Sequence, residues 1–188
     1  MAACVTLSEC SPAERALWLD QAERVFFETA YTNSFDSVAD RQTFLKRWFG
    51  NYSETYPQTF LLALDLEAGV TGYLAGCVDS FSPESKTIAG DIDYFTPPFC
   101  AALKNYPSHF HINVMPGHQG KGVGHMLVAQ FEKLCAIGGS PGVHVVTGPS
   151  SRAVKFYEAC GFTKVTPYAG ANPSLAVLIH STHSGSKG

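Results

Sequence analysis

Gln119-Gly120-Lys121-Gly122-Val123-Gly124 is the stretch that decides the fold, because it joins a predicted strand to a predicted helix. Three glycines within five residues let the backbone curl tightly and leave its amides uncovered. The same amides stand ahead of a helix N-terminus, whose partial positive charge attracts an anion. The segment therefore predicts a nest of main-chain donors that fits a pyrophosphate.

The spacing of the glycines excludes two common nucleotide-binding loops. The ATP-binding loop has four residues between its first glycine and a Gly-Lys pair, followed by Ser or Thr. Here only two residues separate Gly117 from Gly120, and Gly122 follows Lys121. The dinucleotide fingerprint Gly-x-Gly-x-x-Gly fails because its third glycine, Gly124, comes one residue early. A nucleotide-dependent enzyme is therefore disfavoured.

Outward from this loop, the hydrophobic pattern predicts strands and helices in alternation. Residues 109–115 alternate as a strand, with His109, His111 and Asn113 on one face. A helix over 122–137 follows and ends at Gly138-Gly139. Before the strand over 109–115, a helix begins at Ser11-Pro12-Ala13-Glu14 and buries Ala13, Leu17, Val25 and Phe26, and a second helix over 38–49 is stopped by a left-handed Gly50. A hairpin of 59–66 and 71–78 follows, and then a long surface excursion over 80–99. The C-terminal elements are a strand over 143–147, a helix from Ser150 or Ser151 to Cys160-Gly161, and strands over 162–168 and 174–180. This order predicts an α/β (α+β) fold, a mixed sheet with helices packed on it, in one domain over 1–180 with a disordered tail over 181–188.

Composition narrows the class of protein. The 188 residues include 45% hydrophobic side chains and carry a net charge of −3, which excludes a disordered chain and gives no basic field for nucleic acid or anionic membrane. No apolar stretch approaches the ~20 residues that a bilayer helix needs. The six cysteines contain no Cys-x-x-Cys pair, so we expect reduced core residues, no zinc or redox motif, and a cytoplasmic protein.

Two motifs together resemble a known family. Gln119-x-x-Gly122-x-Gly124 after a strand is similar to motif A of the GCN5-related N-acetyltransferases (GNAT), which hold the pyrophosphate of acetyl-coenzyme A there. Residues 151–162, Ser-Arg-Ala-Val-Lys-Phe-Tyr-Glu-Ala-Cys-Gly-Phe, resemble the second signature, Asn-x-x-Ala-x-x-Phe-Tyr-x-x-x-Gly-Phe. Ser151 replaces its asparagine, and the alanine is shifted to 153 with Val154 at the small apolar position. Tyr106-Pro107-Ser108-His109 also resembles the acetyltransferase-like domain of O-GlcNAcase and its bacterial relatives.

The GNAT resemblance implies a mixed sheet with helices on both faces and a splayed pair of central parallel strands, here 109–115 and 143–147. Acetyl-coenzyme A would be the acetyl donor, its pantetheine pairing with strand amides. The thioester carbonyl is expected at the amide of Asn113, with Met115 pairing further along the arm; an ordinary central strand is the alternative. The implied coenzyme-binding residues are Asn113, Val114, Met115, Gln119, Gly120, Lys121, Gly122, Val123, Gly124, His125, Ser151, Val154, Phe156 and Tyr157.

The same resemblance suggests catalytic roles. Tyr157 is expected to protonate the leaving thiolate, and its alternative is an aromatic packed at the end of a helix. His109 is the first candidate for the base that deprotonates the amine, and His111 is the second. Both histidines could instead be satisfied polar residues, and they lack a third ligand for a metal site. Asp91 and Asp93 could orient a histidine or bind a cationic substrate.

These expectations combine into an acetyl-coenzyme A-dependent N-acetyltransferase that uses direct attack by a small-molecule or protein amine. Cys135 and Cys160 lie at positions typical of structural residues, which disfavours a covalent enzyme intermediate. The alternative is a catalytically silent module of the same fold that binds coenzyme A or a protein partner.

Overall fold

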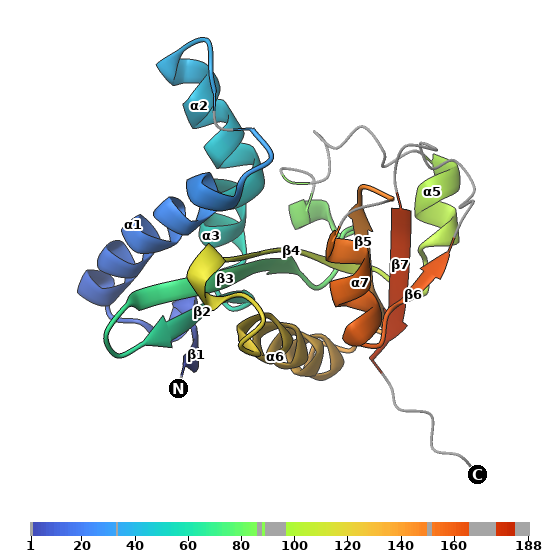
Figure 1. The fold of residues 1–188 in the computed structure, drawn as a ribbon. Coiled ribbons are helices and arrows are strands. Elements are labelled where there is room, and N and C mark those ends of the chain that lie inside the picture. Colours follow the sequence, from blue (N-terminus) through green and yellow to red (C-terminus); the bar gives the residue numbers. More distant parts are fainter. Residues whose placement is uncertain are drawn as a thin grey trace. The chain divides into compact units, whose positions relative to one another are not determined.

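The computed structural model describes residues 2–32, 34–85, 88, 97–149, 152–165 and 176–182. Their strands follow the order β1-β2-β3-β4-β5-β7-β6 in a seven-stranded mixed sheet, which confirms the predicted α/β fold class (Figure 1). The strands are β1 (Ala3–Thr6), β2 (Phe60–Asp65), β3 (Gly69–Cys77), β4 (Ser108–Val114), β5 (Gly142–Thr147), β6 (Thr163–Val165) and β7 (Ala176–Ser181). The helices are α1 (Pro12–Thr29), α2 (Val38–Leu45), α3 (Asn51–Thr55), α5 (Pro97–Ala102), α6 (Val123–Ile137) and α7 (Arg152–Ala159), with a π-helical turn at Lys46–Gly50 and 3₁₀ turns at Leu7–Glu9, Pro83–Ser85 and Pro116–His118.

The chain divides into two compact units that interleave in sequence. Unit 1 comprises Met1–Gly76 and His111–Phe131, and unit 2 comprises Cys77–Phe110 and Glu132–Gly188. β4 and α6 each contribute residues to both units. The single domain over 1–180 stays a prediction. Ser181, which the sequence assigns to the tail, is the last residue of β7, and residues 183–188 lie outside the described part.

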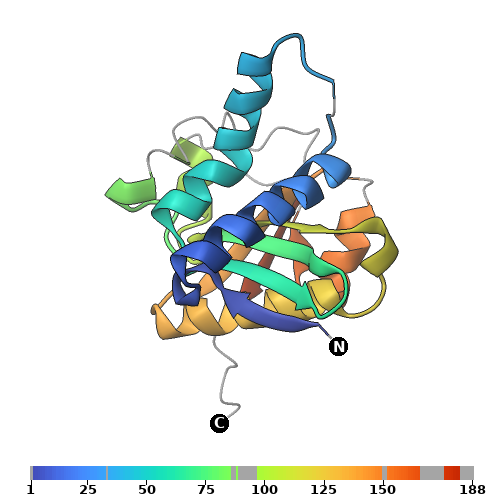
Figure 2. The ribbon, with the colours of Figure 1, turned by 90° about the vertical axis from the view of Figure 1, so that its left-hand side faces the viewer.

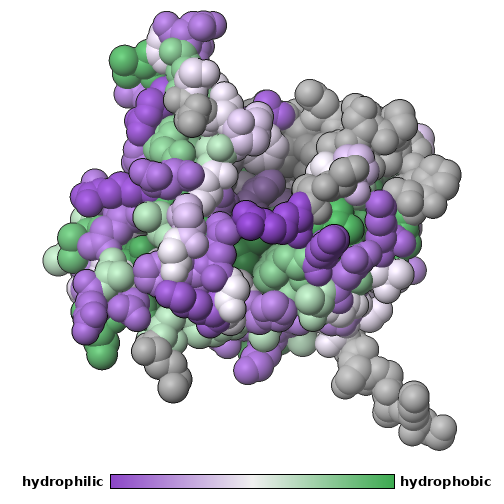
Figure 3. Space-filling view, viewed as in Figure 1, coloured by the Kyte–Doolittle hydropathy of each residue, from purple (hydrophilic) through white to green (hydrophobic). Residues whose placement is uncertain are grey.

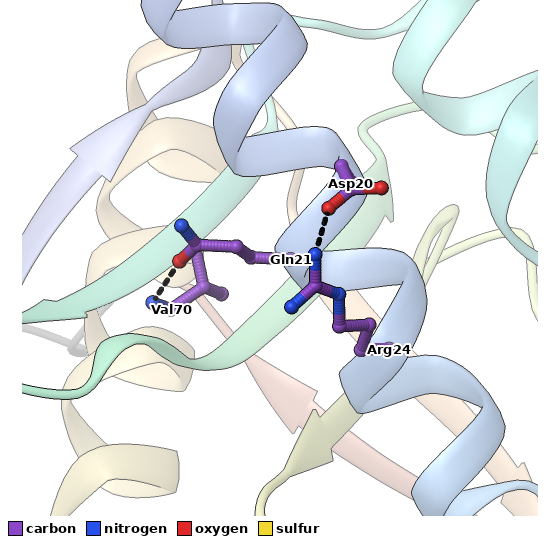
Figure 4. Close-up of polar contacts among 4 residues, drawn as sticks. All are labelled: Asp20, Gln21, Arg24 and Val70. Atoms are coloured by element: carbon purple, nitrogen blue, oxygen red, sulfur yellow. Dashed lines mark hydrogen bonds and ion pairs between the residues drawn. The ribbon is translucent and has the colours of Figure 1, made fainter.

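In unit 1, α1 lies across the β2–β3 hairpin (Figure 2). Its start is as predicted: Ser11 caps the helix, and Glu14 closes the capping box. Gln21 anchors it to the hairpin by accepting a hydrogen bond from the Val70 amide at 2.9 Å, and Arg24 pairs with Asp20 on the outer side (Figure 4).

The surface along α1 that Figure 3 shows is largely hydrophilic, with scattered hydrophobic residues. Leu17 is 55% exposed, so its predicted place in the core is wrong. At 3.6 residues per turn it points about 140° away from Ala22 and about 180° away from Phe26, which are the buried residues. The buried stripe of α1 is Ala22, Val25 and Phe26.

The second helix does not stop at Gly50, which corrects the predicted left-handed cap. Gly50 has a right-handed φ of −61°, and the helical path continues through the π-helical turn into α3. The extra residue of a π turn rotates the side chains after it around the helix axis. Both Phe49 and Tyr52 are consequently buried, and the Phe49 ring lies 5.1 Å from Phe60 and 5.2 Å from Tyr73.

In unit 2, the segment 80–99 is not simply a surface excursion, which corrects that prediction for the residues described. Ser80, Ser85 and Phe99 are almost fully buried. The residues from Pro97 form α5, because proline suits the first turn of a helix. Asp91 and Asp93 lie outside the described residues.

The C-terminal elements confirm the predicted helix and strands. α7 ends at Ala159, and the turn that follows contains Gly161, whose φ of 91° requires glycine or a strained residue. β5 pairs with β7 from Gly142↔Ser181 to Thr147↔Ala176, and β6 pairs with β7 on its other edge. β6 covers Thr163–Val165, and residues 166–168 of the predicted strand over 162–168 lie outside the described residues.

Candidate functional site

The glycine-rich turn of unit 1 adopts a conformation that requires glycine. Gly120 has a φ of 74° and Gly122 a φ of 84°. A Cβ atom built on either residue, or on Gly117, would meet nothing within 4 Å. The glycines are therefore required by backbone conformation rather than by crowding, and the surface above the turn is open.

The turn leads directly into the N-terminus of α6. The amide of Met126 donates to the Gly122 carbonyl at 3.0 Å. The amides of residues 123–125 come before this hydrogen bond, in the first turn of the helix, where amides have no acceptor within the helix. Val123 is buried and anchors the first turn, while the side chains of Lys121 and His125 are exposed. An anion-binding turn has this combination of amides, helix dipole and a nearby cationic lysine.

The end of β4 is held by β3. The amide of Met115 donates to the Thr71 carbonyl at 2.9 Å. The Asn113 carbonyl lies 3.0 Å from the Cβ position of Gly72, so it also faces β3. The amides of Asn113 and Met115 point to the same edge, because backbone groups two residues apart in a strand share a side.

The backbone groups of the alternate residues, Ile112 and Val114, lie on the opposite edge of β4. The Gln119 side-chain amide donates to the Val114 carbonyl at 2.9 Å, which places that carbonyl on the edge away from β3. The Val114 amide, and that of Ile112 two residues earlier, share this edge. The amides of Asn113 and Met115, which the sequence predicts to contact the coenzyme, therefore lie on the edge of β4 that faces β3.

The Asn113 side chain connects three elements of unit 1. The Tyr73 hydroxyl donates to its Oδ1 at 3.2 Å, and its Nδ2 donates to the Thr29 hydroxyl. That hydroxyl in turn donates to the Val25 carbonyl at 2.6 Å. Asn113 thus fixes β4 to β3 and α1, a structural role that the sequence did not reveal.

His111 has an aromatic environment. Its ring lies 4.9 Å from Trp48 and 5.3 Å from Tyr52, edge to face with both. Burial lowers the pKa of His111 to about 4, so the ring is neutral at physiological pH.

His109 belongs to unit 2 and has a polar environment. Its side chain is 3% exposed, and its Nδ1 lies 2.6 Å from the Ser80 hydroxyl. Its ring lies 5.7 Å from that of His144, its register partner on β5. The sequence pattern missed Ser80 because it assigned residue 80 to an exposed excursion.

Tyr157 lies near the end of α7 in an aromatic cluster. It is 7% exposed, and its ring lies 5.9 Å from Phe110, 5.8 Å from Phe162 and 5.3 Å from Phe156. Val154, one turn earlier, is also buried. Ser151 lies outside the described residues.

Neither a metal cluster nor a membrane span occurs among the described residues. No group of three or more His, Cys, Asp or Glu side chains in this part of the chain is arranged to hold a metal ion. No helix among these residues is both long and apolar enough to span a bilayer. None of the six cysteines, which all lie in the described part of the chain, forms a disulfide, and Cys77 and Cys135 are buried.

The fold resembles that of several solved structures. SsHAT has 18% sequence identity and a TM-score of 0.69, with 97% of this chain and 98% of that chain covered. A GNAT-superfamily phosphinothricin acetyltransferase from Sinorhizobium meliloti, solved with acetyl-coenzyme A, has 19% identity, a TM-score of 0.53, and coverage of 96% and 88%. The ribosomal-protein-S18-alanine N-acetyltransferase of Escherichia coli has 11% identity, a TM-score of 0.58, and coverage of 100% and 98%. At these identities the likeness concerns the fold.

A family model assigns the chain more specifically. The acetyltransferase (GNAT) domain matches residues 62–164, which is more than half of the 188 residues and runs from β2 to β6. The match includes the glycine-rich turn and α7. The chain therefore belongs to the GNAT family of acetyltransferases.

Proposed function

We propose that this chain transfers the acetyl group of acetyl-coenzyme A to an amine by direct attack. The observation that carries the proposal is the open turn with two left-handed glycines immediately ahead of α6. The acceptor is a small-molecule or protein amine. The named relatives illustrate both classes, since one is a phosphinothricin acetyltransferase and another acts on an alanine of ribosomal protein S18.

The pyrophosphate would occupy the turn. Main-chain amides of residues 120–124 are the proposed donors, with Lys121 and His125 adding positive charge at an exposed position. Gln119 contributes indirectly, because its bond to the Val114 carbonyl ties the turn to the end of β4. Charge-assisted bonds of this kind contribute about 1.5–3 kcal/mol each.

The pantetheine arm would follow the edge of β4 that faces away from β3. We assign its main-chain partners to Ile112 and Val114, while Asn113 and Met115 hold the strand in place through their bonds to β3 and α1. A fixed amide aimed at the developing oxyanion lowers a barrier by about 3 kcal/mol.

Tyr157 is the proposed acid for the leaving thiolate. Tyr157→Phe removes the hydroxyl and keeps the ring among Phe110 and Phe162. General acid catalysis contributes typically 10²–10⁴-fold, so we expect turnover to fall by about 100-fold while the affinity for acetyl-coenzyme A is unchanged. Thiol release measures turnover, and calorimetry measures affinity. Full turnover with a chemistry-limited substrate would exclude the acid role.

His109 is the proposed base in preference to His111. Taking a proton from an ammonium group is harder for a weaker base. A pKa of about 4 makes His111 a weak base. His109 is preferred on geometry, because its Nδ1 has the Ser80 hydroxyl as a hydrogen-bond partner at 2.6 Å. We expect His109→Gln to lower kcat more than His111→Gln does, in the same thiol-release assay.

The test of the overall function is thermal-shift titration with acetyl-coenzyme A, followed by thiol release over a panel of small amines, amino sugars and lysine peptides. Stabilisation by the coenzyme together with release for an amine class supports the proposal. Stabilisation without release from any amine would identify a silent coenzyme-binding module. Absence of stabilisation would reject the coenzyme site itself.

A further inference from the structure

We propose that Ser80 is a positioning residue that holds His109 in the tautomer whose Nε2 carries the lone pair. This inference rests on the proposed role of His109 as the base, and it concerns residues of unit 2 only. It assigns a function to a serine that lies outside both sequence motifs.

The hydroxyl of Ser80 stands between two partners. Its Oγ lies 2.5 Å from the Pro107 carbonyl oxygen and 2.6 Å from Nδ1 of His109. The Ser80 main-chain amide donates to the same carbonyl at 2.9 Å, which fixes residue 80 beside the start of β4. Ser80 and His109 are each 3% exposed, so this geometry is shielded from solvent.

Counting protons fixes the direction of each bond. A serine hydroxyl has one proton, and a carbonyl oxygen can only accept. The proton of Ser80 therefore points at the Pro107 carbonyl, and the hydroxyl offers a lone pair to His109. Nδ1 of His109 must then carry the hydrogen. In a neutral imidazole this leaves Nε2 with the lone pair, as a base needs.

The reverse arrangement is unfavourable for a physical reason. If the Ser80 hydroxyl donated to His109, its oxygen lone pair would face the Pro107 carbonyl oxygen at 2.5 Å. Two acceptor oxygens would then face each other without a proton between them, and the repulsion between their lone pairs disfavours this arrangement.

His144, which lies beside His109, is also protonated at Nδ1, and here a single contact is enough to show it. Nδ1 of His144 lies 2.6 Å from the Tyr106 carbonyl oxygen, which can only accept. Nδ1 of His144 is therefore the protonated nitrogen. The consecutive carbonyls of Tyr106 and Pro107 thus orient two histidines, directly for His144 and through Ser80 for His109.

A spectroscopic experiment tests the tautomer directly. The full chain is labelled with ¹⁵N-histidine, and the His109 signals are identified by their loss in His109→Gln. In the wild-type protein we expect Nδ1 of His109 to be protonated and Nε2 not. In Ser80→Ala, which removes the acceptor of the Nδ1 hydrogen, we expect a mixture of tautomers. A wild-type His109 protonated at Nε2, or a Ser80→Ala spectrum identical to the wild type, would overturn the proposal.

Ser85→Ala provides a matched control. Its hydroxyl is equally buried and bonds to the Ser80 carbonyl at 2.6 Å and the Ser82 carbonyl at 2.7 Å, without contacting His109. We expect this variant to keep the wild-type tautomer and turnover. If it altered the tautomer as much as Ser80→Ala does, the effect would be general loosening and the proposal would fail.

Kinetics separate this proposal from the base role of His109. Ser80→Ala should lower kcat about tenfold and leave the KM for acetyl-coenzyme A unchanged, since the serine is assigned to orientation of the base and not to coenzyme binding. If His109→Gln had wild-type turnover, the base role of His109 would be rejected. The ¹⁵N spectrum of the wild-type protein would still test the tautomer of His109 in that case. The same spectrum remains the test of the tautomer should the Ser80→Ala variant not fold.

Discussion

Replacing Gly122 by alanine isolates the contribution of the left-handed turn. Its φ of 84° is a conformation that alanine adopts only with strain, and the added Cβ would meet nothing within 4 Å. The whole effect is therefore backbone strain, about 1–2 kcal/mol. Gly117→Ala is the matched control, because Gly117 lies in the same loop, has open space for a Cβ and does not have a positive φ.

The strain can appear in two measurements. If the unliganded turn keeps its conformation, the free energy of unfolding falls; if it relaxes without ligand, the affinity falls instead. The two losses together should equal about 1–2 kcal/mol. Were the entire loss expressed in binding, the Kd for acetyl-coenzyme A would rise about 5- to 30-fold.

Calorimetry with acetyl-coenzyme A and chemical denaturation of the unliganded protein give the two losses. Acetyl-pantetheine, which has no pyrophosphate, serves as the second ligand, and its affinity should be the same for Gly122→Ala and the wild type. The reasoning is refuted if the summed loss for Gly122→Ala is below about 0.5 kcal/mol, or if Gly117→Ala shows the same loss. An equal loss of affinity for acetyl-pantetheine would place the pyrophosphate elsewhere.

Three further predictions concern stability. Gly76→Ala would place a Cβ 2.1 Å from a ring carbon of a buried phenylalanine, so we expect the free energy of unfolding, measured by urea titration, to fall by about 1–3 kcal/mol. Gly50→Ala is the control, because Gly50 is helical and its added Cβ would have no contact under 3.8 Å. We expect this variant to be neutral or stabilising. The pKa of about 4 for His111 lies below its ordinary value, so the unfolded chain binds more protons between pH 6.5 and 4 and the folded state loses stability as pH falls through that range. Between pH 7 and pH 5 the free energy of unfolding of His111→Phe should fall by about 2 kcal/mol less than that of the wild type. If the two proteins lost the same stability over this range, His111 would not contribute to the pH dependence. Asn113→Ala removes the acceptor of the buried Tyr73 hydroxyl and should destabilise the fold by about 1–3 kcal/mol, measured by denaturation; a smaller effect in Asn113→Asp, which keeps an acceptor, would identify this bond as the cause.

Local signals predicted most of the elements correctly because their causes are local. Ser11 and Glu14 form the expected capping box, and α7 ends at Ala159, next to the predicted stop at Cys160-Gly161. Where the cause lies in packing, the same rules failed. Gly50 continues a helix because the aromatic residues around it are drawn into the core, and Leu17 is exposed because the hairpin covers a different side of α1.

The candidate site divides in the same way. The glycines of the turn are recognisable from spacing, since only glycine adopts both left-handed positions without strain. The edge of β4 that is available to a ligand depends on which β4 amides are bonded to β3. The spacing of residues within β4 does not indicate the register of the neighbouring strand. The sequence pattern therefore located the strand, and the bond of Met115 to β3 is the reason that we propose Ile112 and Val114 as the main-chain partners in place of Asn113 and Met115.

By itself, then, the sequence determined the family-defining turn, the order of the elements and the fold class, because these depend on residues close together in the chain. Tertiary structure alone decided the environments of the two β4 histidines. His109 meets Ser80, 29 residues earlier, and His111 meets the aromatic rings of Trp48 and Tyr52. A side chain's tautomer and pKa depend on its surroundings in space, and residues far apart in the chain supply those surroundings only after folding.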